Sequence, residues 1–148
     1  MSASKYGPKT TAEEAIQGYS LAGYDAIVTG GSSGIGAETA RVFAKAGARV
    51  VITARDMAKA NDVLESIKKS TGNNQVEVMK LEIDSLKSVD EFVRKYLALN
   101  RPLSILVNNA GIMACPKALT KDGFESQFGT NHIGHHALTV GLLPALKA

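Results

Sequence analysis

Apolar residues along the chain form four short runs, and segments of helical character separate them. The runs cover residues 26–28, 50–52, 76–81 and 103–107, and their length and β-branched content predict buried strands. Helices are expected between and after these runs, over residues 34–46, 56–72 and 89–96 and from about residue 124 to the end. Strands and helices that alternate in this way predict a parallel sheet with helices on both faces, since each crossover must return over the sheet.

Several helix boundaries carry recognisable signals. Thr11 and Glu14 have the spacing of a capping box, so a short helix is expected before the first strand. Asp56 can cap the helix that follows the second strand, and Gly72 can end it. Residues 1–10 precede these signals and are predicted to be flexible, whereas residues 11–148 are expected to form one domain.

The composition narrows the class of protein. A length of 148 residues with 45% hydrophobic content fits one domain with a single core. The 17 basic residues are mixed with 14 acidic ones, which does not favour nucleic-acid binding. No window has the length and apolar character of a membrane span, and the first residues lack the profile of a secretory signal. With a single cysteine, Cys115, a cytoplasmic protein is expected, and an organelle lumen or stroma stays open.

The segment TGGSSGIG, residues 29–36, joins the first expected strand to the first long helix. In such a turn one glycine permits the sharp bend, another lets the backbone approach a pyrophosphate, and a third lets the helix pack on the strand. No Lys-Ser or Lys-Thr follows the glycines, so a dinucleotide is favoured over a nucleoside triphosphate. The cofactor-binding residues predicted here are Gly30, Ser32, Ser33, Gly34, Ile35 and Gly36.

The residue after the second strand indicates which dinucleotide is preferred. An NAD-selective site places a carboxylate at this position to accept the ribose hydroxyls, and that carboxylate would repel a 2′-phosphate. Here Ala54 ends the strand and Arg55 follows it. Because a guanidinium suits a phosphate, the sequence predicts NADP(H), although a solvated surface arginine is the alternative.

The motifs resemble those of the short-chain dehydrogenases/reductases. TGGSSGIG matches the Thr-Gly-x-x-x-Gly-Ile-Gly pattern of that family, and NNAG at 108–111 and NHIGH at 131–135 follow at suitable separations. The wider string LTKDGFESQFGTNHIGHHALT is similar to the branch of retinol dehydrogenases, WW-domain oxidoreductases and chloroplast-translocon-associated proteins. The resemblance covers about residues 10–148 and implies an α/β, Rossmann-type, doubly wound parallel sheet, here partial, with four strands in the order 3-2-1-4.

The resemblance also implies roles for individual residues. Glu82 stands where the family has an aspartate near the adenine amino group, and Ile83 is expected to line the adenine pocket. Along the adenosine ribose the family places the residues that correspond to Asn109, Ala110 and Gly111. Asn108 either braces the sheet or contacts the ligand.

Catalysis in this family rests on an Asn-Ser-Tyr-Lys set, of which Asn131 matches the asparagine. The tyrosine and lysine act together four residues apart, but none of the four tyrosines of this chain has a lysine at that spacing. The chain is therefore interpreted as the nucleotide-binding part of an NADP(H)-dependent oxidoreductase of alcohols or carbonyls, truncated before the Tyr-x-x-x-Lys segment and inactive alone. The alternative is a catalytically silent NADP(H) sensor or interaction module.

Two further expectations concern metal and partners. His132, His135 and His136 have spacings that would share a helix face, but no other ligand completes a zinc motif, so no metal is expected. The fourth strand would be an uncovered sheet edge, which predicts self-association or a partner polypeptide in addition to a small-molecule substrate.

Overall fold

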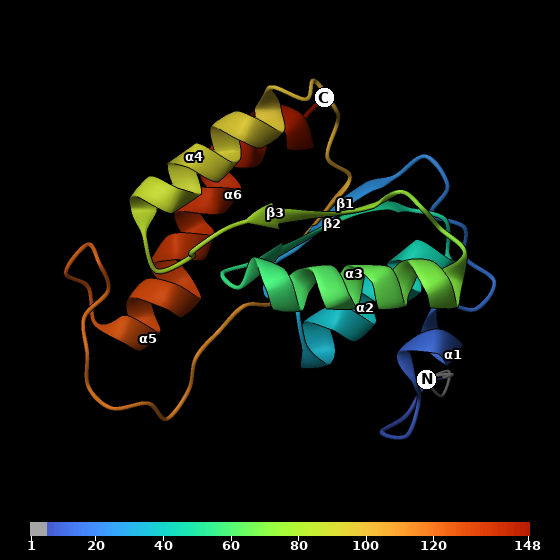
Figure 1. Cartoon of the computed structure of the whole chain (residues 1–148), viewed down its shortest axis with the longest axis horizontal. Coiled ribbons are helices and arrows are strands. Elements are labelled where there is room, and N and C mark those ends of the chain that lie inside the picture. The colour runs from blue at the N-terminus through green and yellow to red at the C-terminus, as the bar shows by residue number, and fades with distance from the viewer. Residues whose placement is uncertain (1–5) are drawn as a thin grey trace, which may run out of the picture.

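The computed structural model describes residues 6–148, which form a four-stranded parallel sheet with helices on both faces (Figure 1). The strands are β1 (Asp25–Val28), β2 (Arg49–Ala54), β3 (Val76–Lys80) and β4 (Ile105–Val107), in the order β3-β2-β1-β4. The helices α2 (Gly34–Lys45) and α3 (Met57–Thr71) cover one face, and α4 (Leu86–Leu97) and α6 (His135–Leu146) cover the other. The predicted fold class, strand order and alternation of elements are confirmed.

Alternating side chains of the strands divide the core into two layers. Ile27 and Val51 point to the face that α4 and α6 cover, where they join Phe92 and Leu138. The neighbouring strand residues point to the face of α2 and α3 and pack with helix residues there; this second cluster contains Val28, Val50, Ile52, Ala40, Ala44 and Ile67. Because both faces are covered, the strands are continuous apolar runs and lack the alternation of a half-exposed sheet.

The predicted helix boundaries follow from local hydrogen bonds. The Asp56 side chain accepts a hydrogen bond of 3.1 Å from the backbone N–H of Lys59 at the start of α3, and Gly72 ends the helix at a φ of 71°. Thr11 and Glu14 form the predicted capping box at the start of α1 (Ala12–Ile16). These boundaries were readable in the sequence because each depends on residues within one turn of the helix.

The last helical segment differs from the single helix expected from about residue 124. It begins two residues later with α5 (Ser126–Phe128), because Glu125 caps it by accepting hydrogen bonds from two backbone N–H groups. A π-helix, η1 (Gly129–Gly134), then precedes α6. π-helical turns are uncommon and occur often at functional sites.

The two ends of the described chain have different surroundings. The prediction of flexibility for residues 1–10 falls partly on residues 1–5, which lie outside the described residues. Helix α1 is joined to α2 by ion pairs of Glu13 with Arg41 and Lys45. Strand β4 lies at one edge of the sheet, and its three residues are partly exposed.

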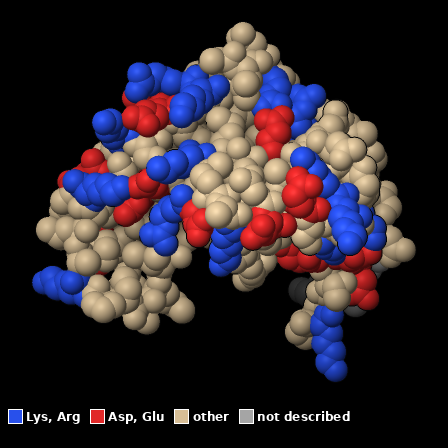
Figure 2. Space-filling view, viewed as in Figure 1, with Lys and Arg blue, Asp and Glu red and all other residues tan. Residues whose placement is uncertain are grey.

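Basic and acidic side chains are interspersed over the face that Figure 2 shows, in agreement with the mixed charge pattern of the sequence. No continuous basic stripe is visible on that face. Within residues 6–148, none of the helices is both long enough and apolar enough to span a membrane.

Gly134 provides a test of the packing between the last helical segment and the sheet. A Cβ atom at this position would lie 2.0 Å from the carbonyl oxygen of Ile83. We expect Gly134→Ala to lower the free energy of unfolding by about 1–3 kcal/mol, because the backbone must shift to relieve the overlap. Urea denaturation followed by circular dichroism measures this, and Gly7→Ala, where a Cβ meets nothing within 4 Å, is the control. Equal midpoints for both variants would contradict the close approach.

Candidate functional site

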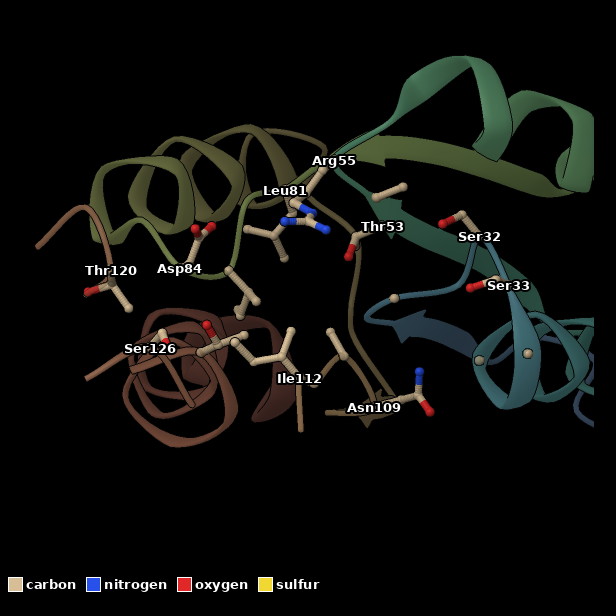
Figure 3. Close-up of a pocket in the computed structure, with 18 of the residues that line it drawn as sticks. Ser32, Ser33, Thr53, Arg55, Leu81, Asp84, Asn109, Ile112, Thr120 and Ser126 are labelled. Carbon is tan, nitrogen blue, oxygen red and sulfur yellow. The ribbon is translucent and has the colours of Figure 1, made fainter. Parts of the chain in front are cut away.

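The four parallel strands end at one edge of the sheet, and the segments that follow them line a cavity of about 580 Å³ (Figure 3). A cavity of this size at the carboxyl ends of the strands is typical of ligand sites in doubly wound folds. Eleven of the thirteen residues predicted as site residues line it: Gly30, Ser32, Ser33, Gly34, Ile35, Gly36, Arg55, Ile83, Asn109, Ala110 and Gly111. The other two, Glu82 and Asn131, are not among the lining residues.

Glycine is required in the turn between β1 and α2 for two separate reasons. Gly30 and Gly34 have φ angles of 64° and 53°, in the left-handed region that glycine adopts without strain. At Gly36 a Cβ atom would lie 2.4 Å from the carbonyl oxygen of Gly30 and 2.5 Å from Nδ2 of Asn109. These three glycines line the cavity, and the first N–H groups of α2 receive no capping hydrogen bond from the Ser33 side chain, so they can meet an anionic ligand.

The hydroxyl of Thr29 joins the end of β1 to the segment after β4. Its Oγ1 accepts hydrogen bonds of 2.9 Å from the backbone N–H groups of both Asn109 and Ala110. The Asn109 side chain donates to the carbonyl oxygen of Thr29, also at 2.9 Å. Thr29 is fully buried, and these bonds fix two walls of the cavity relative to each other.

Arg55 follows the last residue of β2, and its side chain reaches into the cavity (Figure 3). The guanidinium is exposed and has no ion-pair partner among residues 6–148. A cation without a carboxylate partner beside a glycine turn is available to an anionic group of a ligand.

Glu82 is directed away from the cavity. Its carboxylate pairs with Lys121 and, at 3.1 Å, with Lys80. Lys121 and then Lys80 hold the pKa of the Glu82 carboxyl below its ordinary value. The carboxylate that lines the cavity at this end is Asp84, two residues further on.

The ion pair of Glu82 also fixes a loop that forms one wall. Lys121 belongs to the segment after the cavity-lining residues 118–120, and its neighbour Asp122 accepts a hydrogen bond of 2.8 Å from the backbone N–H of Leu86. These two contacts attach the loop to the connection between β3 and α4. The sequence did not indicate this wall, because it comes from a loop about 40 residues away along the chain.

Asn131 lies in η1, and its side chain forms hydrogen bonds with the backbone of a residue that lines the cavity. Its Nδ2 donates to the carbonyl oxygen of Ile112 at 2.8 Å, and its Oδ1 accepts from the N–H of Ile112 at 2.9 Å. This paired contact holds Ile112, which lines the cavity. Asn108 donates to the hydroxyl of Thr139 and is absent from the lining, which corresponds to the bracing alternative.

The spacing of the three histidines suggests a shared helix face, but the structure does not place them on one face. His132 and His136 are exposed and stack with each other, at 6.3 Å between ring centroids, whereas His135 is 5% exposed. Within the described part of the chain, no three His, Cys, Asp or Glu side chains lie close enough to share a metal ion. Cys115 is a free thiol, with its Sγ 3.8 Å from Oγ of Ser126.

Comparison with known proteins gives consistent matches over most of the chain. The sequence model described as short chain dehydrogenase matches residues 25–148. The chain is 48% identical over 145 residues to Short-chain dehydrogenase TIC 32 B, chloroplastic, of Brassica napus, covering 98% of this chain and 45% of that protein. It is also 48% identical over 121 residues to Retinol dehydrogenase 12 of Mus musculus, covering 82% of this chain and 38% of that protein. The chain thus spans less than half the length of these curated relatives.

The fold is also similar to that of a solved structure described as the Pseudomonas aeruginosa RhlG/NADP active-site complex. The TM-score is 0.74 at 32% sequence identity, covering 86% of this chain and 50% of that one. This similarity agrees with the parallel sheet order.

Removal of the Thr29 hydroxyl tests the junction between the two cavity walls. We expect Thr29→Val to lower the free energy of unfolding by about 1–3 kcal/mol, because the N–H of Ala110 loses its acceptor, whereas the N–H of Asn109 also donates to the carbonyl oxygen of Val107 at 3.0 Å. Thr29→Ser keeps the hydroxyl and is the matched control. Chemical denaturation of the three proteins measures the difference, and a valine variant as stable as the serine variant would refute the role of the hydroxyl.

Proposed function

Because this chain belongs to the short-chain dehydrogenase family of oxidoreductases, we propose that its cavity binds NADP(H) for hydride transfer to or from an alcohol or carbonyl. In this proposal residues 11–148 are the nucleotide-binding domain. The single observation that carries the preference for NADP(H) is Arg55, whose guanidinium has no ion-pair partner within residues 6–148 and reaches into the cavity next to the glycine turn.

The glycine turn fits the diphosphate of a dinucleotide. A side chain at position 36 would overlap the carbonyl oxygen of Gly30 and Nδ2 of Asn109, so glycine lets α2 begin close to the end of β1, and Gly30, Gly34 and Gly36 all line the cavity. The Ser33 side chain makes no capping hydrogen bond to α2, which leaves its hydroxyl and the first N–H groups of the helix to the phosphates. We assign Ser32, Ile35 and the turn glycines to the same contact.

The 2′-phosphate is assigned to Arg55. At the end of β2 a carboxylate would accept ribose hydroxyls and repel this phosphate, and the chain has Ala54 followed by Arg55 there. A guanidinium can donate two parallel hydrogen bonds to a phosphate, so it favours the phosphorylated cofactor by charge and by geometry. The relative described as an RhlG/NADP complex supports this assignment at the level of the family.

The adenosine is assigned to the part of the cavity next to Arg55, because the 2′-phosphate is attached to the adenosine ribose. Ile83 gives an apolar surface for the adenine, and Asn109, Ala110 and Gly111 border its ribose. The position of Asp84 in the lining makes it the better candidate than Glu82 for a polar contact to the base, since Glu82 is paired with Lys80 and Lys121.

Asn131 is the one family catalytic position present in this chain. Bound NADP(H) would supply the hydride, and in the family an asparagine at this place holds a water of the proton relay. The Asn131 side chain is engaged with the backbone of Ile112 here, which keeps the amide in one orientation beside the cavity. Names of relatives such as Retinol dehydrogenase 12 favour a lipophilic carbonyl or alcohol as substrate.

Two further assignments concern partners and place. The partly exposed strand β4 at the sheet edge favours association with a second copy or with another polypeptide. A cytoplasmic location is proposed from the composition, and the chloroplastic relative of Brassica napus favours an organelle as the alternative.

Reversal of the charge at Arg55 tests the choice of cofactor. We expect Arg55→Asp to weaken binding of NADPH by about tenfold or more while changing that of NADH by less than about threefold, since only NADPH carries the 2′-phosphate. Calorimetric titration of each cofactor measures both constants. Arg94→Asp, on the exposed surface of α4, is the control for net charge. A similar loss for the two cofactors would reject the assigned phosphate contact.

The catalytic residues present in the 148-residue chain predict that it has no activity. No tyrosine in it has a lysine four residues later, so we expect NADPH oxidation with aldehydes, retinal included, at the rate of a protein-free control. Absorbance at 340 nm follows the reaction. Turnover clearly above that control would show that another group serves as the general acid.

A further inference from the structure

His135 is a buried ionisable group near the cavity that the proposed function leaves without a role. It is the first residue of α6 and is 5% exposed. Its Nε2 lies 2.9 Å from Oγ1 of Thr29, and its Nδ1 lies 3.2 Å from the carbonyl oxygen of Asn131. The imidazole therefore stands between the hydroxyl that fixes two cavity walls and the π-helix that carries Asn131.

The two partners determine where the imidazole proton is. The carbonyl oxygen of Asn131 can only accept, so Nδ1 must carry the hydrogen. A neutral imidazole has one N–H, which leaves Nε2 as an acceptor for the hydroxyl proton of Thr29. The other acceptor near that hydroxyl, the carbonyl oxygen of Val107, is more distant at 3.3 Å.

With this arrangement the bonding capacity of the Thr29 hydroxyl is used completely. Its proton goes to His135, and its two lone pairs accept from the N–H groups of Asn109 and Ala110. A protonated His135 would present a third N–H to an oxygen that has two lone pairs. The neutral ring thus orients the hydroxyl so that both lone pairs face the segment after β4.

The Nδ1 side of the imidazole contacts Asn131, which also holds the segment after β4. Asn131, whose carbonyl oxygen faces Nδ1, holds Ile112 with both atoms of its side-chain amide. The imidazole of His135 therefore links Thr29, which holds residues 109 and 110, to Asn131, which holds residue 112. All three residues line the cavity, whereas His135 does not touch it.

We propose that His135 is a positioning residue for the nucleotide, which acts through Thr29 and Asn131 on the cavity wall formed by residues 109–112 and does so as the neutral Nδ1–H tautomer. This inference rests on the proposed function that the cavity binds NADP(H). It adds a residue that the cofactor motifs do not include.

The surroundings keep the ring neutral. Burial lowers the pKa of His135 below its ordinary value, and the hydrogen bond to Asn131 opposes this in part. Its partners Thr29 and Asn131 are uncharged, residues 108–112 include no ionisable side chain, and His132 and His136 of its own helical segment are exposed. A lowered pKa means that stability from the neutral form is present above the ordinary value, about pH 6.5, and is lost as the pH falls through the folded pKa.

The tautomer can be tested on the wild-type protein without ligand. Long-range ¹H–¹⁵N spectra distinguish a protonated from an unprotonated ring nitrogen, and Thr29→Val identifies the His135 signal by its shift. We expect Nδ1 protonated and Nε2 unprotonated at pH 7. Protonation of Nε2, alone or with Nδ1, would overturn the inference, and this measurement does not depend on the folding of a histidine variant.

Two variants test the effect on the ligand. His135→Gln has a carbonyl oxygen at about the position of Nε2, so it can still accept from Thr29, whereas His135→Asn is too short to reach it. In calorimetric titrations with NADP⁺ we expect the Gln variant to bind within about threefold of wild type and the Asn variant to bind about tenfold or more weakly. Circular dichroism confirms that each variant is folded.

The outcomes separate the two proposals. Wild-type protein that does not bind NADP⁺ would overturn the proposed function. Wild-type protein that binds NADP⁺, with an Asn variant of equal affinity or a Gln variant as weak as the Asn variant, would overturn the positioning role alone.

Discussion

The buried hydroxyl of Thr29 is the contact on which the arrangement of the cavity depends. It is the point at which the end of β1, the segment after β4 and the last helical segment meet, and it holds them with one proton and two lone pairs. Because the hydroxyl is fully buried, each of these bonds must be made within the protein. At Gly36 there is no room for a Cβ atom, because it would lie 2.5 Å from Nδ2 of Asn109, and this amide donates to the carbonyl oxygen of Thr29.

Charge is distributed in the cavity so that a cation stays available. Arg55 has no ion-pair partner among residues 6–148, while the neighbouring Glu82 is paired with Lys80 and Lys121. The Glu82 carboxylate is thereby used to attach the loop of residues 118–122. The carboxylate that lines the cavity is that of Asp84.

Local sequence predicted most of the fold, since its determinants act over short distances. The capping interactions of Thr11 and Asp56, the left-handed end at Gly72 and the apolar runs of the strands depend on residues within a few positions of each other. The resemblance to a known family added the strand order, which the structure confirms. The π-helix was not foreseen; its last residue, Gly134, packs closely against Ile83 in the connection after β3, a contact between segments about 50 residues apart.

What the sequence determined by itself was therefore the order of elements, the bare glycine turn and the presence of Arg55 where an NAD site would have a carboxylate. What only the tertiary structure decided was the use of three polar side chains: Glu82 holds a loop, Asn131 holds a backbone segment, and His135 is buried against Thr29. The physical reason is that a charged or polar side chain on a flexible stem can turn to either side of its backbone. Its choice is made by partners that lie tens of residues away and come near only when the sheet and its helices have assembled.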